Sequence, residues 1–243
     1  MIKYKDIHSH LLPMVDDGVK SFDKAISNIK VMVEKGFDEI IVTPHYYEKN
    51  IYISNNNEKR ILFERLEEEV EKNNLDIKLY LGNEIFLLDN LIKYLDDDKI
   101  CSLNNSKYLL IEFPTNMYYD FYEDYFQRLI DKGFIPIIAH PERYKFYQED
   151  FSLIYKLRNI GVLFQVNYGS IDGYYGKDIK KFSKKLLKNK VIDFLGTDIH
   201  SNSINVERIS KISKKIIKII GKDKFYELSY LNISKVINNE EIN

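Results

Sequence analysis

The amino-acid sequence predicts one α/β domain in which parallel strands form a barrel-like sheet covered by helices. Short β-branched and apolar runs alternate with amphipathic stretches along the chain, as in folds built from strand–helix units. The length of 243 residues suits a single α/β barrel. No composition break, internal repeat or low-complexity segment marks a boundary, so we expect residues 1–243 to form a single domain.

Seven strands are predicted from the apolar runs. Their expected bounds are Tyr4–His8, Glu39–Thr43, Lys78–Gly82, Tyr108–Glu112, Ile135–Ala139, Leu163–Asn167 and Asp193–Gly196. In an α/β barrel the ligand site lies at the carboxyl ends of the strands. The side chains that follow these strands are therefore the first candidates for a functional site.

Amphipathic stretches fill the intervals between the strands. Ser21 is a candidate N-cap of the first helix, which Gly36 ends, and Leu66 and Val70 keep helical spacing in the second. The predicted helices are Ser21–Lys35, Asn55–Asn74, Tyr118–Lys132, Phe151–Ile160, Ile179–Asn189 and Val206–Ile220, and a last helix begins near Asp223.

All five histidines of the chain lie at or just past the end of a predicted strand. They are His8, His10, His45, His140 and His200. A single histidine at such a place usually has a structural role, but five by chance would be unusual. Because strand ends share one rim of a barrel, we expect the imidazoles to gather there.

Two pairs of candidate ligands are spaced by two residues. The run D-I-H-S-H holds His8 and His10, and T-D-I-H holds Asp198 and His200. Alternate residues of a strand point to the same face, about 6–7 Å apart along the backbone. Each pair can therefore share one metal ion, although an isolated H-x-H is often a chance pair.

Carboxylates accompany the histidines. V-D-D-G offers Asp16 and Asp17 beside Gly18, which allows a tight turn, and D-D-G alone also marks an ordinary acidic turn. Glu84 follows one predicted strand, and Glu112 ends an otherwise apolar one. A buried carboxylate needs a partner, which a metal ion or a buried arginine would supply.

The remaining candidates follow two further strands. T-P-H places His45 after the run that ends at Thr43, and A-H-P-E-R places His140 after Ala139. Arg143 lies three residues beyond His140 and has the planar fork that suits a phosphate group. Many surface arginines are only solvated, and that alternative stays open here.

Nine side chains thus converge at the predicted rim, too many for one ion and suitable for two or three. They are His8, His10, Asp17, His45, Glu84, Glu112, His140, Asp198 and His200. Nitrogen and oxygen donors without thiolate favour Mn, Fe or Zn. Clustered divalent ions activate water and neutralise charge, which phosphoester hydrolysis needs most.

These motifs, taken in order, resemble the polymerase-and-histidinol-phosphatase (PHP) superfamily. The matching runs are D-I-H-S-H-L-L-P-x-V-D-D-G, T-P-H, N-E, H-P-E-R-Y and G-T-D-I-H, from about Asp6 to His200. Within the superfamily, the sequence is most similar to the bacterial manganese-dependent protein-tyrosine phosphatases of capsule and exopolysaccharide loci. The resemblance implies a distorted, TIM-like (β/α)7 barrel that binds three divalent metal ions. Mn is the metal expected first, and Fe, Zn and Co are the alternatives.

The resemblance also implies a role for each residue. One ion would be held by His8, His10, Glu84 and Asp198, a second by Glu84, Glu112 and His140, and a third by Asp17, His45 and His200. Arg143 would bind phosphate, and a bridging hydroxide would attack phosphorus without a covalent phosphoenzyme. The implied substrate is a phosphotyrosine protein, namely a bacterial tyrosine autokinase that controls polysaccharide export.

Two positions depart from the family pattern. Met14 stands where members usually have glycine in the P-G-x-D-D-G run. A second arginine that members carry soon after the D-x-H motif has no close counterpart, and Arg208 is the nearest, farther along the chain. Both departures concern phosphate binding and leave the implied metal ligands unchanged.

Other functional classes find little support. Cys101 is followed six positions later by Lys107 rather than arginine, so a cysteine-dependent tyrosine phosphatase is excluded, and neither a P-loop nor a G-x-S-x-G motif occurs. Two interpretations stay open: a small-molecule phosphatase acting on a substrate such as histidinol phosphate, and a non-catalytic metal-binding module.

Composition sets the expected surroundings. A net charge of −1 gives no general attraction to nucleic acid or to an anionic membrane, and no apolar run has the ~20 residues that span a bilayer. With one cysteine and no signal-like N-terminus, we expect a cytoplasmic protein without nucleic-acid partners or membrane insertion.

A lysine-rich segment, which we call the basic stretch, has the spacing typical of the solvated face of an amphipathic helix. It comprises Lys177, Lys180, Lys181, Lys184, Lys185 and Lys188. Five tyrosines could either line a cleft at the site or pack in the core. They are Tyr46, Tyr47, Tyr118, Tyr119 and Tyr122.

Overall fold

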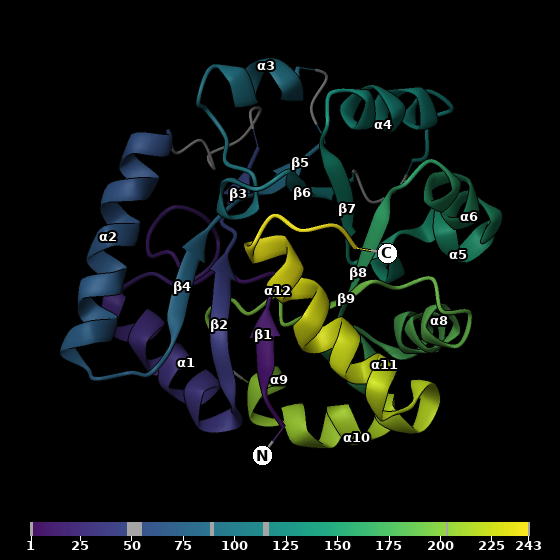
Figure 1. Ribbon diagram of the computed structural model, residues 1–243. Helices are drawn as coiled ribbons and strands as arrows, with labels where there is room; N and C mark the ends of the chain where they lie inside the picture. Colours follow the sequence, from purple (N-terminus) through teal and green to yellow (C-terminus); the bar gives the residue numbers. More distant parts are fainter. Residues whose placement is uncertain (1, 48–54, 88–89, 114–116, 203, 243) are drawn as a thin grey trace.

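Parallel strands occupy the centre of the molecule, and helices surround them (Figure 1). This computed structural model describes residues 2–47, 55–87, 90–113, 117–202 and 204–242. Every paired strand is parallel to its neighbours. The predicted α/β class is therefore confirmed.

The strands form two sheets. The smaller sheet has the order β1 (Tyr4–Asp6), β2 (Phe37–Val42) and β4 (Lys78–Leu81). The larger sheet has the order β3 (His45–Tyr46), β5 (Glu84–Phe86), β6 (Tyr108–Glu112), β7 (Ile135–Ala139), β8 (Leu163–Asn167) and β9 (Phe194–Gly196).

Two of the predicted strands are each followed, after a short break, by a second short strand. Thr43 and Pro44 separate β2 from β3, and Gly82 and Asn83 separate β4 from β5. Proline has no N–H to donate, which interrupts the ladder. Each of these two chain segments thus passes from the smaller sheet into the larger one. The predicted strand ends at Thr43 and Gly82 lie within one residue of the observed ends of β2 and β4, whereas the short strands β3 and β5 were not predicted.

Backbone contacts also link the first strand to the last. The N–H of Asp198 donates to the carbonyl of His8 at 2.9 Å, and the N–H of His10 donates to the carbonyl of Ile199 at 2.8 Å. Ser9 forms a parallel bridge with Ile199. The carboxyl ends of β1 and β9 are therefore neighbours, as the barrel-like arrangement requires.

The helices follow the predicted alternation, with local differences. Ser21 caps the first helix by accepting from Lys24 N, and Gly36 ends it at φ 99°. The expected helix Val206–Ile220 is divided at Arg208. The described helices are α1 (Phe22–Lys35), α2 (Asn56–Lys72), α3 (Leu91–Asp96), α4 (Tyr122–Asp131), α5 (Lys145–Glu149), α6 (Ser152–Asn159), α7 (Tyr168–Asp172), α8 (Lys177–Lys188), α9 (Ile204–Glu207), α10 (Ile209–Ile220), α11 (Lys222–Tyr226) and α12 (Asn232–Ile237).

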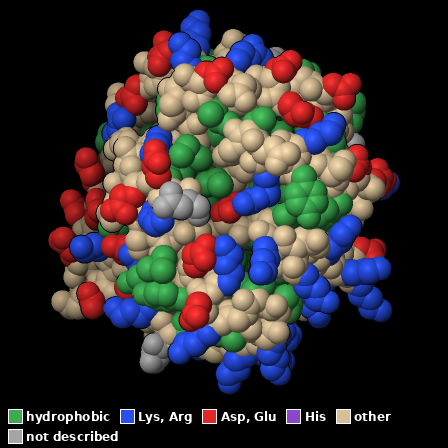
Figure 2. All heavy atoms as spheres, turned by 45° about the vertical axis from the view of Figure 1, so that its right-hand side comes forward, with side chains coloured by type: hydrophobic (Ala, Val, Ile, Leu, Met, Phe, Trp, Pro, Cys, Tyr) green, Lys and Arg blue, Asp and Glu red, His purple; other side chains and the backbone are tan. Residues whose placement is uncertain are grey.

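The basic stretch forms one face of α8. Phe182 and Leu186 are buried, while Lys181, Lys185 and Lys188 are exposed. The side of the molecule that carries α8 comes forward in Figure 2, where Lys and Arg side chains are numerous in the lower half of the visible face. This arrangement confirms the prediction of a solvated face on an amphipathic helix.

Residues at the end of the chain fill one end of the strand arrangement. Ile233 and Val236 of α12 pack in a buried cluster with Ile7 of the first strand region and Phe194 of β9. The helices at this end of the chain, drawn in yellow, lie across β1 in Figure 1. Apolar packing thus occupies this end, which leaves the carboxyl ends of the strands for polar side chains.

A buried lysine stabilises the two strand breaks. Lys59 of α2 is 1% exposed, and its Nζ donates to Oδ1 of Asn83 at 2.6 Å. The Nδ2 of Asn83 donates in turn to the carbonyl of Pro44 at 2.8 Å. One hydrogen-bonded chain therefore joins both breaks and α2. Burial lowers the pKa of Lys59 to about 8.

We expect Lys59 to make folding stability depend on pH in the alkaline range. Between pH 8 and 10.5 the unfolded chain binds this proton more strongly than the folded protein, so its contribution to stability rises with pH. Relative to Lys59→Met, the wild type should gain at most about 1.4 kcal/mol per pH unit in that window. Urea unfolding of both proteins in matched buffers measures the difference, and a constant difference across the window would contradict it.

Candidate metal centre

The structure brings all nine predicted ligands together. Their donor atoms form overlapping sets, and within each set one donor atom per residue lies within 4.8 Å of all the others. The sets are His10, Asp17, His45 and His200; His8, His10 and Asp198; His8, Glu84 and His140; and His45, Glu84 and Glu112. The carboxyl ends of the strands thus hold a continuous cluster of imidazoles and carboxylates.

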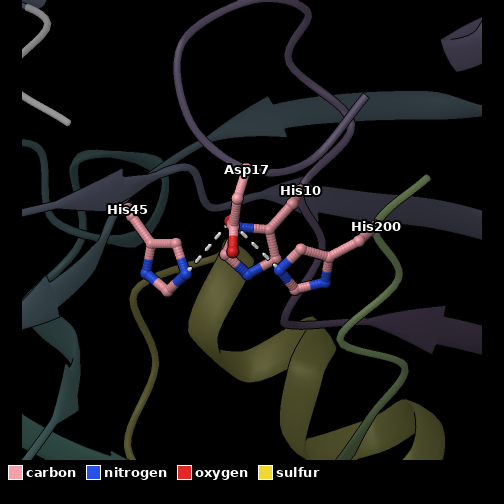
Figure 3. Close-up of side chains that lie close together, drawn as sticks. All are labelled: His10, Asp17, His45 and His200. Atoms are coloured by element: carbon pink, nitrogen blue, oxygen red, sulfur yellow. Dashed lines mark ion pairs between the residues drawn. The ribbon is translucent and has the colours of Figure 1, made fainter. Parts of the chain in front are cut away.

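The first set, shown in Figure 3, contains three side chains that are exposed or partly exposed and one, His10, that is buried. Asp17, from the loop after β1, points its Oδ1 between two imidazoles. This oxygen lies 3.5 Å from Nε2 of His45 and 3.3 Å from Nε2 of His200. The ring of His10 stacks on that of His200, with centroids 4.0 Å apart. Four side chains from three separate chain segments therefore face one point.

Hydrogen bonds on the far side of two imidazoles determine which nitrogens are available. Nδ1 of His8 lies 2.9 Å from Oε1 of Gln165, and Nδ1 of His10 lies 2.8 Å from Oδ2 of Asp16. Both oxygens accept, so each neutral imidazole carries its proton on Nδ1 and a lone pair on Nε2. The two Nε2 atoms face each other at 3.1 Å. A cation near both atoms, or a proton on one, has to relieve this repulsion.

Glu84 lies at the centre of the cluster. Its Oε2 is 3.0 Å from Nε2 of His8, 3.2 Å from Nε2 of His10 and 3.1 Å from Nδ1 of His45. Its Oε1 is 2.7 Å from Nε2 of His140. Oε2 is buried, yet it makes no hydrogen bond of acceptable geometry within the described residues. An orphaned carboxylate oxygen among imidazole nitrogens is the environment of a bridging metal ligand.

The charges around this carboxylate favour cations. Burial disfavours the charged imidazole of His8, but the negative charges of Glu84 and Asp198 outweigh burial and raise its pKa to about 9. The same two opposing effects, burial and the charge of Glu84, raise the pKa of His45. Burial would raise the pKa of Glu84, whereas the neighbouring imidazoles of His8 and His45 lower it. The cluster therefore requires positive charge, which divalent ions supply.

The chemistry of these residues is suited to binding metal ions. The lone pairs, the orphaned oxygen and the absence of a thiol among the nine donors suit divalent ions that accept mixed nitrogen and oxygen ligands. The grouping differs in part from the one that the family resemblance implies. Glu84 forms one set with His140 and another with Glu112, and His10 joins the set of Asp17.

Asp16 and Asp17 have different positions. Asp16 is buried, and its carboxylate accepts from Nδ1 of His10 at 2.8 Å and from the N–H of His45 at 2.9 Å. Asp17 has a half-exposed side chain that faces His45 and His200. Asp16 thus orients the imidazole of His10 and holds the backbone of His45, while Asp17 presents its oxygen to the cluster.

Two supporting residues on β8, Gln165 and Asn167, are not among the site residues predicted from the sequence. Gln165 accepts from His8, and its Nε2 donates to Oδ1 of Asn167 at 2.7 Å. The Nδ2 of Asn167 donates to Oδ2 of Asp198 at 2.7 Å. Two amides at alternate positions of a strand predicted to be apolar were the available signal, because such residues share one face. They hold a histidine and a carboxylate in fixed orientations.

Arg143 lies at the edge of the cluster. His140 adopts a left-handed conformation at φ 35°, and the short helical turn Pro141–Arg143 follows it. This turn directs the Arg143 guanidinium to Oδ2 of Asp198, with Nη1 at 3.3 Å. Arg208 is held elsewhere, because its Nε donates to Oδ2 of Asp172 at 2.7 Å. Of the two arginines, Arg143 lines the cavity at the metal ligands.

A cavity of about 410 Å³ opens onto the cluster. Carboxylates and imidazoles line it, together with the guanidinium of Arg143. Asp17, His45, Glu84, Glu112, Asp198 and His200 are the ligand candidates that line it. A negatively charged group in this cavity would reach both Arg143 and any cations at the ligands.

The chain is similar to known proteins along nearly its whole length. Residues 4–238 match the family model described as capsular polysaccharide synthesis, CpsB/CapC. CapC of Staphylococcus aureus is 38% identical over 197 residues, which cover 81% of this chain and 76% of CapC. The tyrosine-protein phosphatase YwqE of Bacillus subtilis is 32% identical over 240 residues, which cover 98% of this chain and 92% of YwqE.

Solved structures agree with these relatives. A crystal structure from work on YwqE of Bacillus subtilis and CpsB of Streptococcus pneumoniae, described as metal-dependent tyrosine phosphatases, matches with a TM-score of 0.89 and 30% identity. That match covers 98% of this chain and 96% of the other. A histidinol phosphate phosphatase of Lactococcus lactis shares the fold at a TM-score of 0.55 and 15% identity, and the match covers 89% of this chain and 94% of the other.

Within the described residues, no helix combines the length and the apolar character needed to cross a bilayer. The chain belongs to the CpsB/CapC family of capsular polysaccharide synthesis.

Proposed function

We propose that this protein is a metal-dependent phosphatase that hydrolyses phosphotyrosine in proteins. The observation that carries the proposal is the buried Glu84 carboxylate, which is surrounded by histidine nitrogens beneath a cavity lined by Arg143. Family membership supports it, because YwqE is a tyrosine-protein phosphatase and is similar along nearly the whole chain.

The proposed centre holds three divalent ions, with manganese as the first choice and Fe, Zn and Co as alternatives. Three ions suit nine donors when one carboxylate is shared, and Glu84 occurs in two of the four donor sets. The proposed ligands are His8, His10, Asp17, His45, Glu84, Glu112, His140, Asp198 and His200. When bound, divalent ions lower the pKa of water and neutralise the charge of the phosphate.

The residues of the chain have separate tasks in this proposal. Arg143 binds two phosphate oxygens with its planar fork, beside Asp198, which keeps the guanidinium in place. Asp16 and Gln165 keep the protons of His10 and His8 on Nδ1, so that each Nε2 faces the centre. The phosphorus of the substrate is thereby fixed relative to the attacking water.

The proposed substrate is a tyrosine autokinase of polysaccharide export. The family description, capsular polysaccharide synthesis, supports this choice. The proposed place of action is the cytoplasm, a reducing compartment that suits a chain with one cysteine, Cys101, which is buried and free.

Metal removal and replacement tests the proposed function. After chelation, we expect turnover of a phosphotyrosine peptide to fall to background and to return with Mn, and with Fe, Zn or Co to differing extents. The same peptide carrying phosphoserine, and histidinol phosphate, serve as comparison substrates. Phosphate release measured by a colorimetric assay provides the readout.

Each alternative function has its own outcome in this experiment. A preference for histidinol phosphate would replace the proposal with a small-molecule phosphatase that uses the same centre. Turnover of none of the three substrates by protein that has bound metal would favour the non-catalytic module. Turnover that survives complete metal removal would contradict the metal-dependent mechanism altogether.

Asp16 and Asp17 provide a paired test of the ligand assignment. Asp16→Asn should weaken metal binding about 10- to 100-fold, because His10 loses the charge that fixes its tautomer. Asp17→Asn should lower the number of bound ions, because it replaces a ligand. Asp23→Asn, on an exposed position of α1, is the matched control. Titration calorimetry measures the metal affinity, and metal analysis measures the number of bound ions. Fewer bound ions in Asp16→Asn and only weaker affinity in Asp17→Asn would exchange the two roles.

Arg143 provides a test of phosphate binding. Arg143→Lys keeps the positive charge but loses the planar fork, so we expect kcat/KM for phosphotyrosine peptide to fall on the order of 100-fold. Metal content should stay unchanged, because Arg143 donates no lone pair. Steady-state kinetics with metal analysis measure both quantities. A loss of bound metal that parallels the loss of activity would assign Arg143 a structural role instead.

A further inference from the structure

Four aromatic rings line the cavity together with the ligand candidates. Tyr47 directly follows β3, and Phe86 is the last residue of β5. Tyr174 and Tyr175 lie in the loop after α7. None of the four is needed to explain the metal ligands or the binding of phosphate. Because they share the cavity with the ligand candidates, they can contact the part of a substrate that is attached to the phosphate.

Strand register explains the first pair, which we call the strand wall (Tyr47 and Phe86). β3 pairs with β5 so that His45 lies opposite Glu84, and Tyr46 lies opposite Ile85. Alternate residues of a strand face the same side. The two strands that bring His45 beside Glu84 therefore also bring Tyr47 beside Phe86, with ring centroids 3.9 Å apart.

The same geometry sets the depth of the strand wall. Two residues along a strand correspond to about 6.6 Å. Tyr47 and Phe86 thus form the next layer of side chains above His45 and Glu84, in the direction of the cavity mouth. A group attached directly to a phosphate at the ligands would lie at this level.

The second pair, the loop wall (Tyr174 and Tyr175), comes from a different part of the rim. It follows β8 and α7, and β8 lies three positions from β5 in the sheet order. The ring of Tyr175 packs under the Arg143 guanidinium, 5.4 Å from its centroid, and its hydroxyl points to Asp198 at 3.5 Å. Tyr174 is 51% exposed and meets Tyr175 edge-on at 5.0 Å.

We propose that the strand wall and the loop wall hold the aryl ring of the substrate and make this centre selective for aryl over alkyl phosphate esters. The inference rests on the proposed phosphatase function and names the residues that determine its specificity. In an aryl phosphate, one ester oxygen joins phosphorus to the ring, so the ring lies at the level of the walls. Ring-to-ring contacts favour such a group, whereas the thin methylene of an alkyl phosphate leaves the walls without contacts.

Binding of two phosphonates tests this proposal without relying on turnover. Phenylphosphonate and methylphosphonate present the same charged group and differ in the ring, and both resist hydrolysis. Titration calorimetry on the manganese-loaded wild type should give tighter binding of phenylphosphonate. In Tyr47→Leu and in Phe86→Leu, this preference should fall roughly threefold to tenfold, while the Kd of methylphosphonate stays the same.

Tyr155→Leu is the matched control, because this tyrosine lies on α6 and is 44% exposed. It should keep the wild-type preference. A purely structural effect of the wall variants would weaken both phosphonates by the same factor and would overturn the proposal. Equal affinities in the wild type would overturn it as well. Failure of the proposed function is distinguishable, since it would appear as absent phosphotyrosine turnover in the wild type.

Discussion

The buried carboxylate of Glu84 is the feature on which the rest of the centre depends. A carboxylate removed from water is costly unless positive charge surrounds it, and here three imidazole nitrogens lie within 3.2 Å of a single oxygen. These imidazoles come from two widely separated chain segments. The strand ends must therefore converge closely, and the converged cluster in turn requires cations. The proposed metal centre thus depends on the barrel-like arrangement of the strands.

The interruptions in two strands are the structural means of this convergence. Pro44 and Asn83 let two chain segments leave the smaller sheet and pair again in the larger one, where His45 lies opposite Glu84. Lys59 holds these breaks together through Asn83 at the expense of burying a cation. The same register continues to Tyr47 and Phe86, so ligand positions and the proposed ring contacts follow from one pairing. The contribution of the strand wall to substrate selectivity would then be a consequence of sheet geometry, and the loop after α7 would supply the loop wall.

Supporting hydrogen bonds divide the cluster into ligands and residues that orient them. Asp16, Gln165 and Asn167 each contact the back of a ligand candidate and have no donor in the four metal sets. Their partners are His10, His8 and Asp198, which share one of those sets. Each member of this set is accordingly oriented by a supporting side chain. Asp17, with its half-exposed carboxylate, lies at the open side instead.

Much of this protein could be predicted from local patterns in its sequence. The alternation of apolar runs and amphipathic stretches determined the α/β class, and the positions of five histidines after strands located the cluster, because periodicity and strand ends are properties of neighbouring residues. Sequence motifs also selected the nine residues that the structure brings together.

Only the tertiary structure decided the remaining features. It assigned Asp16 and Asp17 different positions, showed which ligands share Glu84, and separated Tyr47, at the cavity, from Tyr122, which packs against Phe113. It also showed that the short strands β3 and β5 follow Pro44 and Asn83. Each of these outcomes depends on contacts between residues that are far apart in the chain, such as His8 with Gln165, and local periodicity carries no information about such contacts.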